Sequence, residues 1–193
     1  MRIHPSAPRG IADDAHVQRF ERLFDENYAA VRAYALRRVS PDSVADVVQE
    51  TFLVAWRRPQ EVPANPLPWL LAVARRVVLR EWRSSSRREA LSARVASATP
   101  RHLNAPELED SNADVLAAVE RLPPKDREAL ALVYWDGLST SEAATVLGCT
   151  QTALRVRLHR ARRRLSALLE TTPPRPSNAP LTAATPIPFE EAQ

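Results

Sequence analysis

The hydrophobic residues in the first part of the chain recur every three or four positions, which is the spacing of one face of an α-helix. This pattern begins near Asp14 and includes Val17, Phe20, Leu23, Phe24, Val31, Ala35 and Val39. We expect a break in it near Asn27. No segment shows the sustained alternation that is typical of a strand, so the chain is predicted to be all-α.

Two further helices are expected in this first block. Ser40 is a good N-cap, and Pro41 suits the first helical position, where its missing N–H costs nothing. Pro59 ends that helix. After the proline-rich loop "PQEVPANP", Asn65 is placed to cap a helix over residues 66–83.

The second block begins near Asn112 with "NADVLAAVERL", and two prolines separate this segment from a helix in "PKDREALALVYWDG". Gly137 favours the left-handed conformation that ends a helix. Ser139 and Glu142 have the spacing of a capping box at the start of "TSEAATVL". The turn "GCT" follows, and the last helix starts at Thr150 or Gln151.

The last helix is amphipathic. Its apolar positions predict a buried stripe made of Leu154, Leu158, Ala161, Leu165 and Leu168. The opposite side is cationic and polar and holds Thr152, Arg155, Val156, His159, Arg160 and Arg163. A solvated charged face, a helix on a membrane surface and a nucleic-acid reader are the three interpretations. The stripe lacks the bulky aromatic residues that membrane-surface helices use.

The preceding segment favours nucleic-acid binding. A short helix with Ala143 and Ala144, a tight turn at Gly148 and a threonine cap form a helix-turn-helix, whose second helix enters the major groove. This arrangement predicts base contacts by Gln151, Thr152 and Arg155, and further DNA contacts by Arg157, His159 and Arg160. The arginines along the rest of the helix, including Arg162, Arg163 and Arg164, suit phosphates.

Three segments lie outside the periodic pattern. Residues 1–13 and 171–193 are predicted to be disordered, and residues 90–111 are predicted to form a flexible linker. The predicted organisation is two small helical domains, residues 14–89 and 112–170, with the helix-turn-helix in the second.

Composition limits the kinds of cofactor and metal site that the chain can hold. The chain has 193 residues, a net charge of +4 and a pI of about 9.9, and Lys125 is its single lysine. Its three glycines are too far apart for a phosphate-binding loop or a dinucleotide fingerprint. One cysteine, Cys149, forms no internal disulfide, and the four histidines lack metal-ligand spacing. We therefore expect no cofactor and no bound metal.

No apolar run approaches the roughly 20 residues of a membrane span, and the N-terminus lacks a signal-peptide pattern. We expect a soluble cytoplasmic protein that has no membrane partner.

A second motif, "DVVQETFLVAW", places Asp46, Gln49 and Glu50 on one polar face. No nucleophile or metal set accompanies these carboxylates, which argues against acid–base catalysis. Together with "PWLLAVARRVVLREWR" and "LPPKDREALALVYWDGLSTSEAATVLGCTQTALRVRLHRARRRL", the motif closely resembles bacterial RNA polymerase sigma factors of the extracytoplasmic-function (ECF) group. The resemblance covers residues 17–88 and 112–169, and its two motifs stand in the family's order.

The resemblance implies a role for each block and no enzymatic activity. Asp46, Gln49 and Glu50 are implied to dock on core RNA polymerase. The 59–66 loop and the helix after it are implied to contact the −10 promoter element, through Arg75, Arg76, Arg80, Trp82 and Arg83. The helix-turn-helix is implied to read the −35 element. Independently of the resemblance, helical periodicity predicts a cationic stripe suited to phosphates, made of Arg75, Arg76, Arg80 and Arg83.

The chain departs from the family pattern in the −10 helix, where members often have "ARN" followed by Asp. Arg76 and Arg80 stand at those positions, and the base preference at the −10 element stays open. Trp69 and Trp82 are candidates either for stacking on an unpaired base or for core packing. Core packing is favoured for Trp69, and both interpretations stay open for Trp82.

The prediction is a sigma factor that binds core RNA polymerase and promoter DNA, with an anti-sigma factor as a further candidate partner. The main alternative is a conventional helix-turn-helix regulator, which has no need of "DVVQE" and the basic helix after it. A basic helical protein that associates with RNA or membranes is the other alternative.

Overall fold

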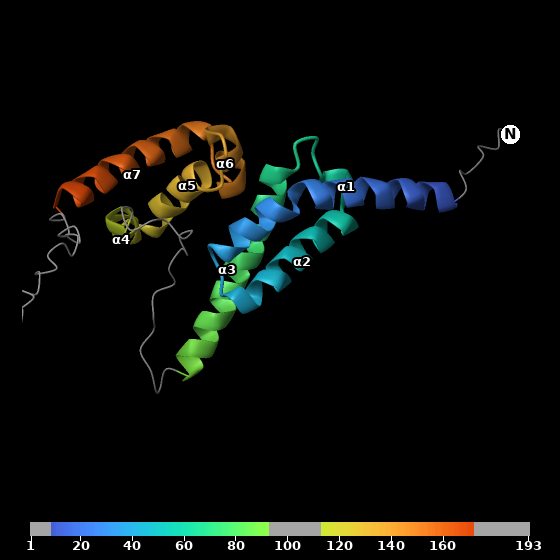
Figure 1. The fold of residues 1–193 in the computed structure, drawn as a ribbon, viewed down its shortest axis with the longest axis horizontal. Coiled ribbons are helices and arrows are strands. Elements are labelled where there is room, and N and C mark those ends of the chain that lie inside the picture. Colours follow the sequence, from blue (N-terminus) through green and yellow to red (C-terminus); the bar gives the residue numbers. More distant parts are fainter. Residues whose placement is uncertain (1–8, 93–112, 172–193) are drawn as a thin grey trace, which may run out of the picture.

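The computed structural model describes residues 9–92 and 113–171, and these residues form seven α-helices and one short 3₁₀-helix, without a strand among them (Figure 1). The all-α prediction is confirmed. The first domain holds α1 (Arg9–Leu36), α2 (Pro41–Arg57), η1 (Pro59–Glu61) and α3 (Leu67–Ser92). The second holds α4 (Ala113–Glu120), α5 (Pro124–Tyr134), α6 (Thr140–Leu147) and α7 (Gln151–Thr171).

Helix α1 is longer and more regular than its sequence pattern indicates. It runs without interruption through Asn27, so the predicted break is wrong. The buried Asn27 amide donates to the carbonyl of Leu23 at 2.8 Å, which satisfies this polar group inside the helix. The helix begins at Arg9, before the predicted start at Asp14, so the predicted disorder is wrong for residues 9–13, which no proline interrupts.

Helix α2 begins at Pro41, as the sequence predicts, with Ser40 in the extended N-cap conformation. The Ser40 hydroxyl contacts the hydroxyl of Ser43 at 3.2 Å and makes no cap hydrogen bond to the backbone. Six residues of α2 are buried, among them Val47, Thr51 and Phe52. The buried Thr51 hydroxyl donates to the Val47 carbonyl at 2.7 Å, so this polar group is satisfied inside the helix. Helix α2 packs against α1 and α3.

Helix α3 starts at Leu67 and continues to Ser92, beyond the predicted end at Arg83. Apolar periodicity stops near Arg83, but the next residues include no proline or glycine, and polar residues propagate a helix that is already nucleated. The side-chain amide of Asn65, predicted as a cap for this helix, donates instead to Glu142 on α6 at 2.9 Å.

The turns of the second domain follow the predicted chemistry. Gly137 and Gly148 have positive φ angles of 69° and 64°. The capping box is complete: Glu142 accepts from the Ser139 N–H at 2.9 Å, and the Glu142 N–H donates to the Ser139 hydroxyl at 3.3 Å. The Thr150 hydroxyl caps α7 by accepting from the N–H of Ala153 at 3.2 Å.

The two domains pack against each other. Helix α3 lies against α6, and one continuous cluster of buried apolar side chains extends from α1, α2 and α3 into α5, α6 and α7. The sequence predicts two small helical domains joined by a flexible linker, and no pattern in it indicates this contact. Most of the predicted linker (93–111) and of the predicted C-terminal tail (172–193) lies outside the described residues.

Candidate nucleic-acid interface

The helix-turn-helix is formed by α6, the turn at Gly148 and α7. Ala143 and Ala144 are buried, and the Cys149 N–H donates to the Ala144 carbonyl at 3.0 Å, which fixes the turn. Leu154, Leu158 and Ala161 are at most 1% exposed, and Leu165 and Leu168 are partly buried against the same core, so the predicted apolar stripe of α7 is confirmed. Cys149 itself packs against the core, as a small apolar residue does.

The leading residues of α7 face solvent. Gln151, Thr152 and Arg155 are all exposed, and the Gln151 amide donates to the Thr140 hydroxyl at 3.2 Å. His159 and Arg160 are exposed and Arg157 is half-buried. The structure therefore leaves the polar side chains at the start of this helix open to a ligand.

The arginines near the end of α7 differ in their partners. The Arg162 Nε donates to the Tyr134 hydroxyl at 2.8 Å, and its guanidinium lies 5.6 Å from the centroid of the Tyr134 ring. Arg164 pairs with Asp126. Both belong to contacts between α7 and α5, and sequence periodicity alone did not separate them from Arg163.

The polar face of α2 lies beside α3. Asp46 and Gln49 are exposed, and Glu50 is half-buried and pairs with Arg80 of α3. A shallow groove between the two helices is lined by these four residues together with Asp42 and Arg57. The hydrogen bond to Glu50 raises the pKa of Arg80. The structure thus joins a residue from the predicted docking set with one from the predicted −10 set.

The arginines of α3 do not form one continuous free stripe. Arg76 and Arg83 are exposed. Arg75 instead turns toward the second domain, where its Nε and Nη2 donate to Glu128 at 2.7 and 3.0 Å. This hydrogen bond raises the pKa of Arg75.

Both tryptophans of α3 pack against the core. Trp69 is partly buried there, in line with the favoured interpretation. Trp82 is half-buried, and its indole N–H donates to the Arg38 carbonyl at 2.8 Å. The polar edge of Trp82 is therefore engaged within the protein.

Two features were missed from the sequence. The first is an aromatic cluster between α1 and α2, where Phe20 lies edge-on to Trp56 at 5.1 Å between ring centroids and Phe24 contacts Phe52 at 4.7 Å. The sequence does carry a signal for this cluster, since Phe20 and Phe24 are one turn apart.

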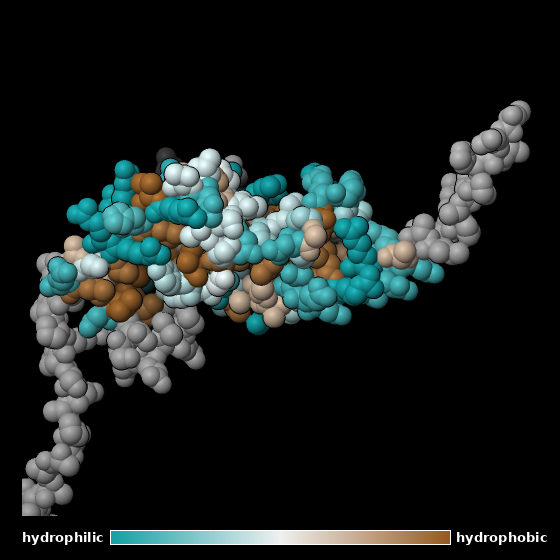
Figure 2. Space-filling view, turned by 90° about the horizontal axis from the view of Figure 1, so that it is seen from above, coloured by the Kyte–Doolittle hydropathy of each residue, from teal (hydrophilic) through white to brown (hydrophobic). Residues whose placement is uncertain are grey.

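The space-filling view in Figure 2 shows hydrophobic residues separated by hydrophilic ones across its face of the molecule.

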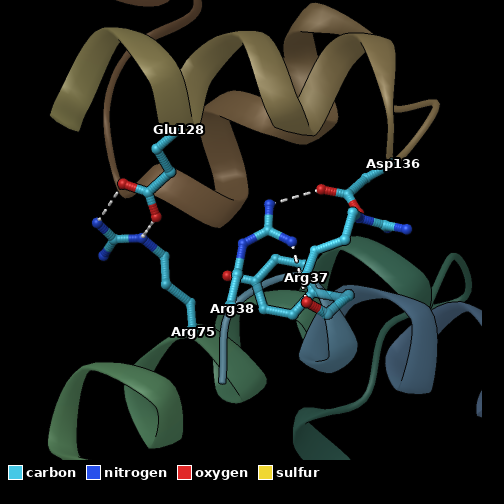
Figure 3. A network of polar contacts seen from close by, with 6 residues as sticks. Arg37, Arg38, Arg75, Glu128 and Asp136 are labelled. Atoms are coloured by element: carbon cyan, nitrogen blue, oxygen red, sulfur yellow. Dashed lines mark hydrogen bonds and ion pairs between the residues drawn. The ribbon is translucent and has the colours of Figure 1, made fainter. Parts of the chain in front are cut away.

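The second missed feature is a set of ion pairs between the domains. Arg38 donates to Asp136 at 2.7 Å, and Arg37 pairs with the same carboxylate (Figure 3). The Arg38 guanidinium carbon lies 3.6 Å from the centroid of the Tyr34 ring. Burial raises the pKa of Tyr34 to about 12, and the nearby Arg38 partly offsets this effect. No local pattern reports these contacts, because the partners are nearly one hundred positions apart.

Within residues 9–92 and 113–171, no group of three or more His, Cys, Asp or Glu side chains is arranged to hold a metal ion. No helix in this part of the chain is long and apolar enough to cross a membrane.

Two protein families match the chain in the order of its domains. Residues 23–88 match Sigma-70 region 2, and residues 112–165 match Sigma-70, region 4. The ECF RNA polymerase sigma factor SigL of Mycobacterium tuberculosis is 34% identical over 154 residues, which are 77% of this chain and 87% of that protein. BldN of Streptomyces coelicolor, also an ECF sigma factor, is 34% identical over 160 residues, or 78% of this chain and 60% of that protein.

Solved structures show the same fold. The sigma factor RpoE of Bartonella quintana, in complex with the anti-sigma factor NepR, superposes with a TM-score of 0.60 and 28% identity, and the match covers 80% of this chain and 98% of RpoE. CnrH in complex with the cytosolic domain of CnrY gives 0.54 and 28%, with 86% and 98% covered.

Proposed function

Since the chain belongs to the ECF group of the sigma-70 family, a group of transcription initiation factors that direct core RNA polymerase to promoters, we propose which of its residues carry out each part of that task. One observation carries the assignment: a region 2 domain and a region 4 domain follow each other on one chain, and each presents an exposed polar surface. The conventional regulator is the weaker alternative, because it needs no region 2.

The first domain binds polymerase through α2. Asp46, Gln49 and Glu50 form the docking surface, and Glu50 pairs with the adjacent Arg80 in the free chain. Charge complementarity between such a surface and its partner sets the rate and specificity of association.

The first domain also holds the −10 element. Arg76 and Arg83 contact phosphates first, because they are exposed, whereas Arg75 and Arg80 are paired with Glu128 and Glu50. Arg75 and Arg80 join them after leaving their carboxylate partners. Trp82 packs alongside as a positioning residue, since its N–H is bonded to Arg38.

The second domain reads the −35 element. Gln151, Thr152 and Arg155 reach base edges from the first turns of α7, where Gln suits adenine and Arg suits guanine. Arg157, His159 and Arg160 follow along the same helix and contact the DNA backbone. The protein acts in the cytoplasm, where polymerase and promoter meet, and catalyses no reaction itself.

An anti-sigma factor is a further partner. The RpoE homologue is solved in complex with such a factor, and the fold of this chain matches it over almost the whole of that protein. The identity of the partner of this chain does not follow from that likeness.

The test is transcription in vitro with purified core polymerase and templates from the organism's own genome. We expect promoter-specific transcripts only when both proteins are present. Asp46→Arg should lower the affinity for core about tenfold or more, by placing like charge against the docking partner. Asp25→Arg, at another exposed carboxylate, on α1, is the matched control and should leave that affinity unchanged.

Tight binding of the protein alone to duplex operators, without any core-dependent transcript, would favour the conventional regulator. Equal affinity for RNA, liposomes and duplex DNA at physiological salt would favour the nonspecific basic protein.

A further inference from the structure

An exposed valine stands on the cationic side of α7. Val156 is 46% exposed, whereas Leu154 and Leu158 on the same helix are at most 1% exposed. At about 100° per residue, Val156 lies about 160° around the helix axis from each of these two leucines. It therefore points almost directly away from the core of its own domain and toward whatever the helix binds.

The surroundings of Val156 are apolar at the centre and cationic at the sides. Thr152 and Ala153, one turn earlier, are exposed, and each carries a methyl group. Arg155 and Arg157 lie about 100° to either side of Val156, on side chains that are several bonds longer. At this level of α7, the outward face is a short apolar ridge between two long cationic side chains.

This arrangement fits the cross-section of the DNA major groove. The groove is about 12 Å wide, and a helix with its side chains is about 10–12 Å across, so the helix fills it. A side chain that points straight at the floor of the groove has room only if it is short. The longer arginines on either side extend outward instead, to a guanine or to a phosphate.

Only one base carries an apolar group on the floor of the major groove. This group is the 5-methyl of thymine, since the other three bases present hydrogen-bond donors and acceptors there without a methyl. Contact between a valine and that methyl leaves no polar atom unpaired, whereas contact with a donor or acceptor would remove its water without replacing it. The Val156 side chain is also preorganised, because valine in a helix keeps one rotamer about 90% of the time.

We propose that Val156 is a specificity-determining residue of the −35 contact and that it reads the 5-methyl group of a thymine. The proposal rests on the proposed function, in which α7 enters the major groove of the −35 element. It adds a thymine to the adenine and guanine contacts proposed for Gln151 and Arg155. It also gives a role to Val156, the one large apolar residue of α7 that is exposed among the described residues.

The test replaces single thymines of the −35 element by deoxyuridine, which removes the 5-methyl group and leaves the pairing edge of the base unchanged. The holoenzyme is assembled from core polymerase and the full-length chain, and its binding is measured on a promoter that it transcribes. Single-base substitutions first locate the −35 element, and every thymine on both strands is then replaced in turn. We expect one replacement to weaken binding about fourfold, which is the effect of losing one buried methyl group.

Val156→Ala should abolish this dependence. Its shorter side chain does not contact the methyl group, so the thymine and deoxyuridine templates should bind equally well, and the pair of changes forms a double-mutant cycle. The salt dependence of binding should stay the same as in the parent, since no charge is removed. Val115→Ala is the matched control at a valine of α4 that is 38% exposed, and it should keep the fourfold difference.

The proposal would be overturned if no deoxyuridine replacement weakened binding, or if the −35 element had no thymine on either strand. A methyl effect that persisted in Val156→Ala would also overturn it, since another side chain would then make the contact. These outcomes leave the sigma-factor assignment standing, because core-dependent transcription measures that assignment separately. If the parent chain gives no core-dependent transcript, the proposed function fails, and the same replacements in operators that the protein binds alone decide the contact of Val156.

Discussion

At the scale of single residues, Glu142 links local chemistry to both domains. Its carboxylate accepts from the Ser139 N–H and hydroxyl and also from the Asn65 amide of the first domain. The Ser139 hydrogen bonds, followed by the one from Asn65, hold the pKa of Glu142 below its usual range. The Glu142 carboxylate therefore helps to cap α6, the first helix of the helix-turn-helix, and also contacts the loop before α3.

We predict that part of the stability of the fold depends on the charge of Glu142. A lowered pKa in the folded state means that this contribution is present above the unfolded pKa, about 4.3 for glutamate, and is lost as the pH falls through the lower folded value. Glu142→Gln should remove that acid-dependent part while retaining the cap. Urea unfolding of both proteins between pH 7 and pH 3 measures it; parallel pH profiles would contradict it.

The residues of α7 should divide into readers of sequence and holders of phosphate. Arg155→Ala should cost about 1–3 kcal/mol on the preferred −35 sequence and relax specificity at one position. Arg160→Ala should weaken all sequences alike and reduce the slope of log K against log salt by about one. Salt titrations of promoter binding by the holoenzyme, on matched and substituted −35 sequences, distinguish the two. If both variants changed the salt slope and the sequence specificity equally, the division into readers of sequence and holders of phosphate would be wrong.

At the scale of elements, local rules predicted the helix boundaries that a proline, a glycine or a capping side chain marks. Pro41, Ser139 and Thr150 mark starts because a cap or a fixed φ acts within one turn of the chain. The far end of α3 had no such signal, since its polar residues prolong a helix without an apolar period. The partners of Arg38 and Arg75 could not be predicted, because they depend on how the two domains pack.

The buried stripe of α7 should be the element most sensitive to truncation. Leu158 is 1% exposed and belongs to the apolar cluster. Leu158→Ala should destabilise the protein by about 2–5 kcal/mol through lost burial and a cavity. Val156→Ala, on the exposed side of the same helix at 46%, is the control and should change stability by about 0.5 kcal/mol or less. Chemical denaturation measures the free energy of unfolding of both variants. Similar losses of stability in the two variants would contradict the burial of this stripe.

At the scale of the whole molecule, a continuous apolar cluster and the ion pairs of Asp136 and Glu128 couple two domains that match two separate families. Coupled domains unfold together, whereas domains without an interface unfold independently. The contact between the domains is therefore expected to contribute to the stability of the whole chain.

Calorimetry should show this coupling directly. We predict one heat-absorption peak for the free chain and two resolved peaks when Asp136→Asn and Glu128→Gln are combined. Asp126→Asn should shift the temperature of the single peak without splitting it. Two peaks in the parent chain would show that the domains are energetically independent.

The pair of Arg75 and Glu128 also constrains how such proteins can be recombined. Arg75 belongs to the region 2 domain and Glu128 to the region 4 domain, so a chimera that takes each domain from a different sigma factor inherits only half of the pair. A chimera with a neutral residue at position 128 leaves Arg75 without its carboxylate. We expect the exchange of promoter specificities by domain swapping to succeed more often when the residues at positions 75 and 128 are transferred as a unit.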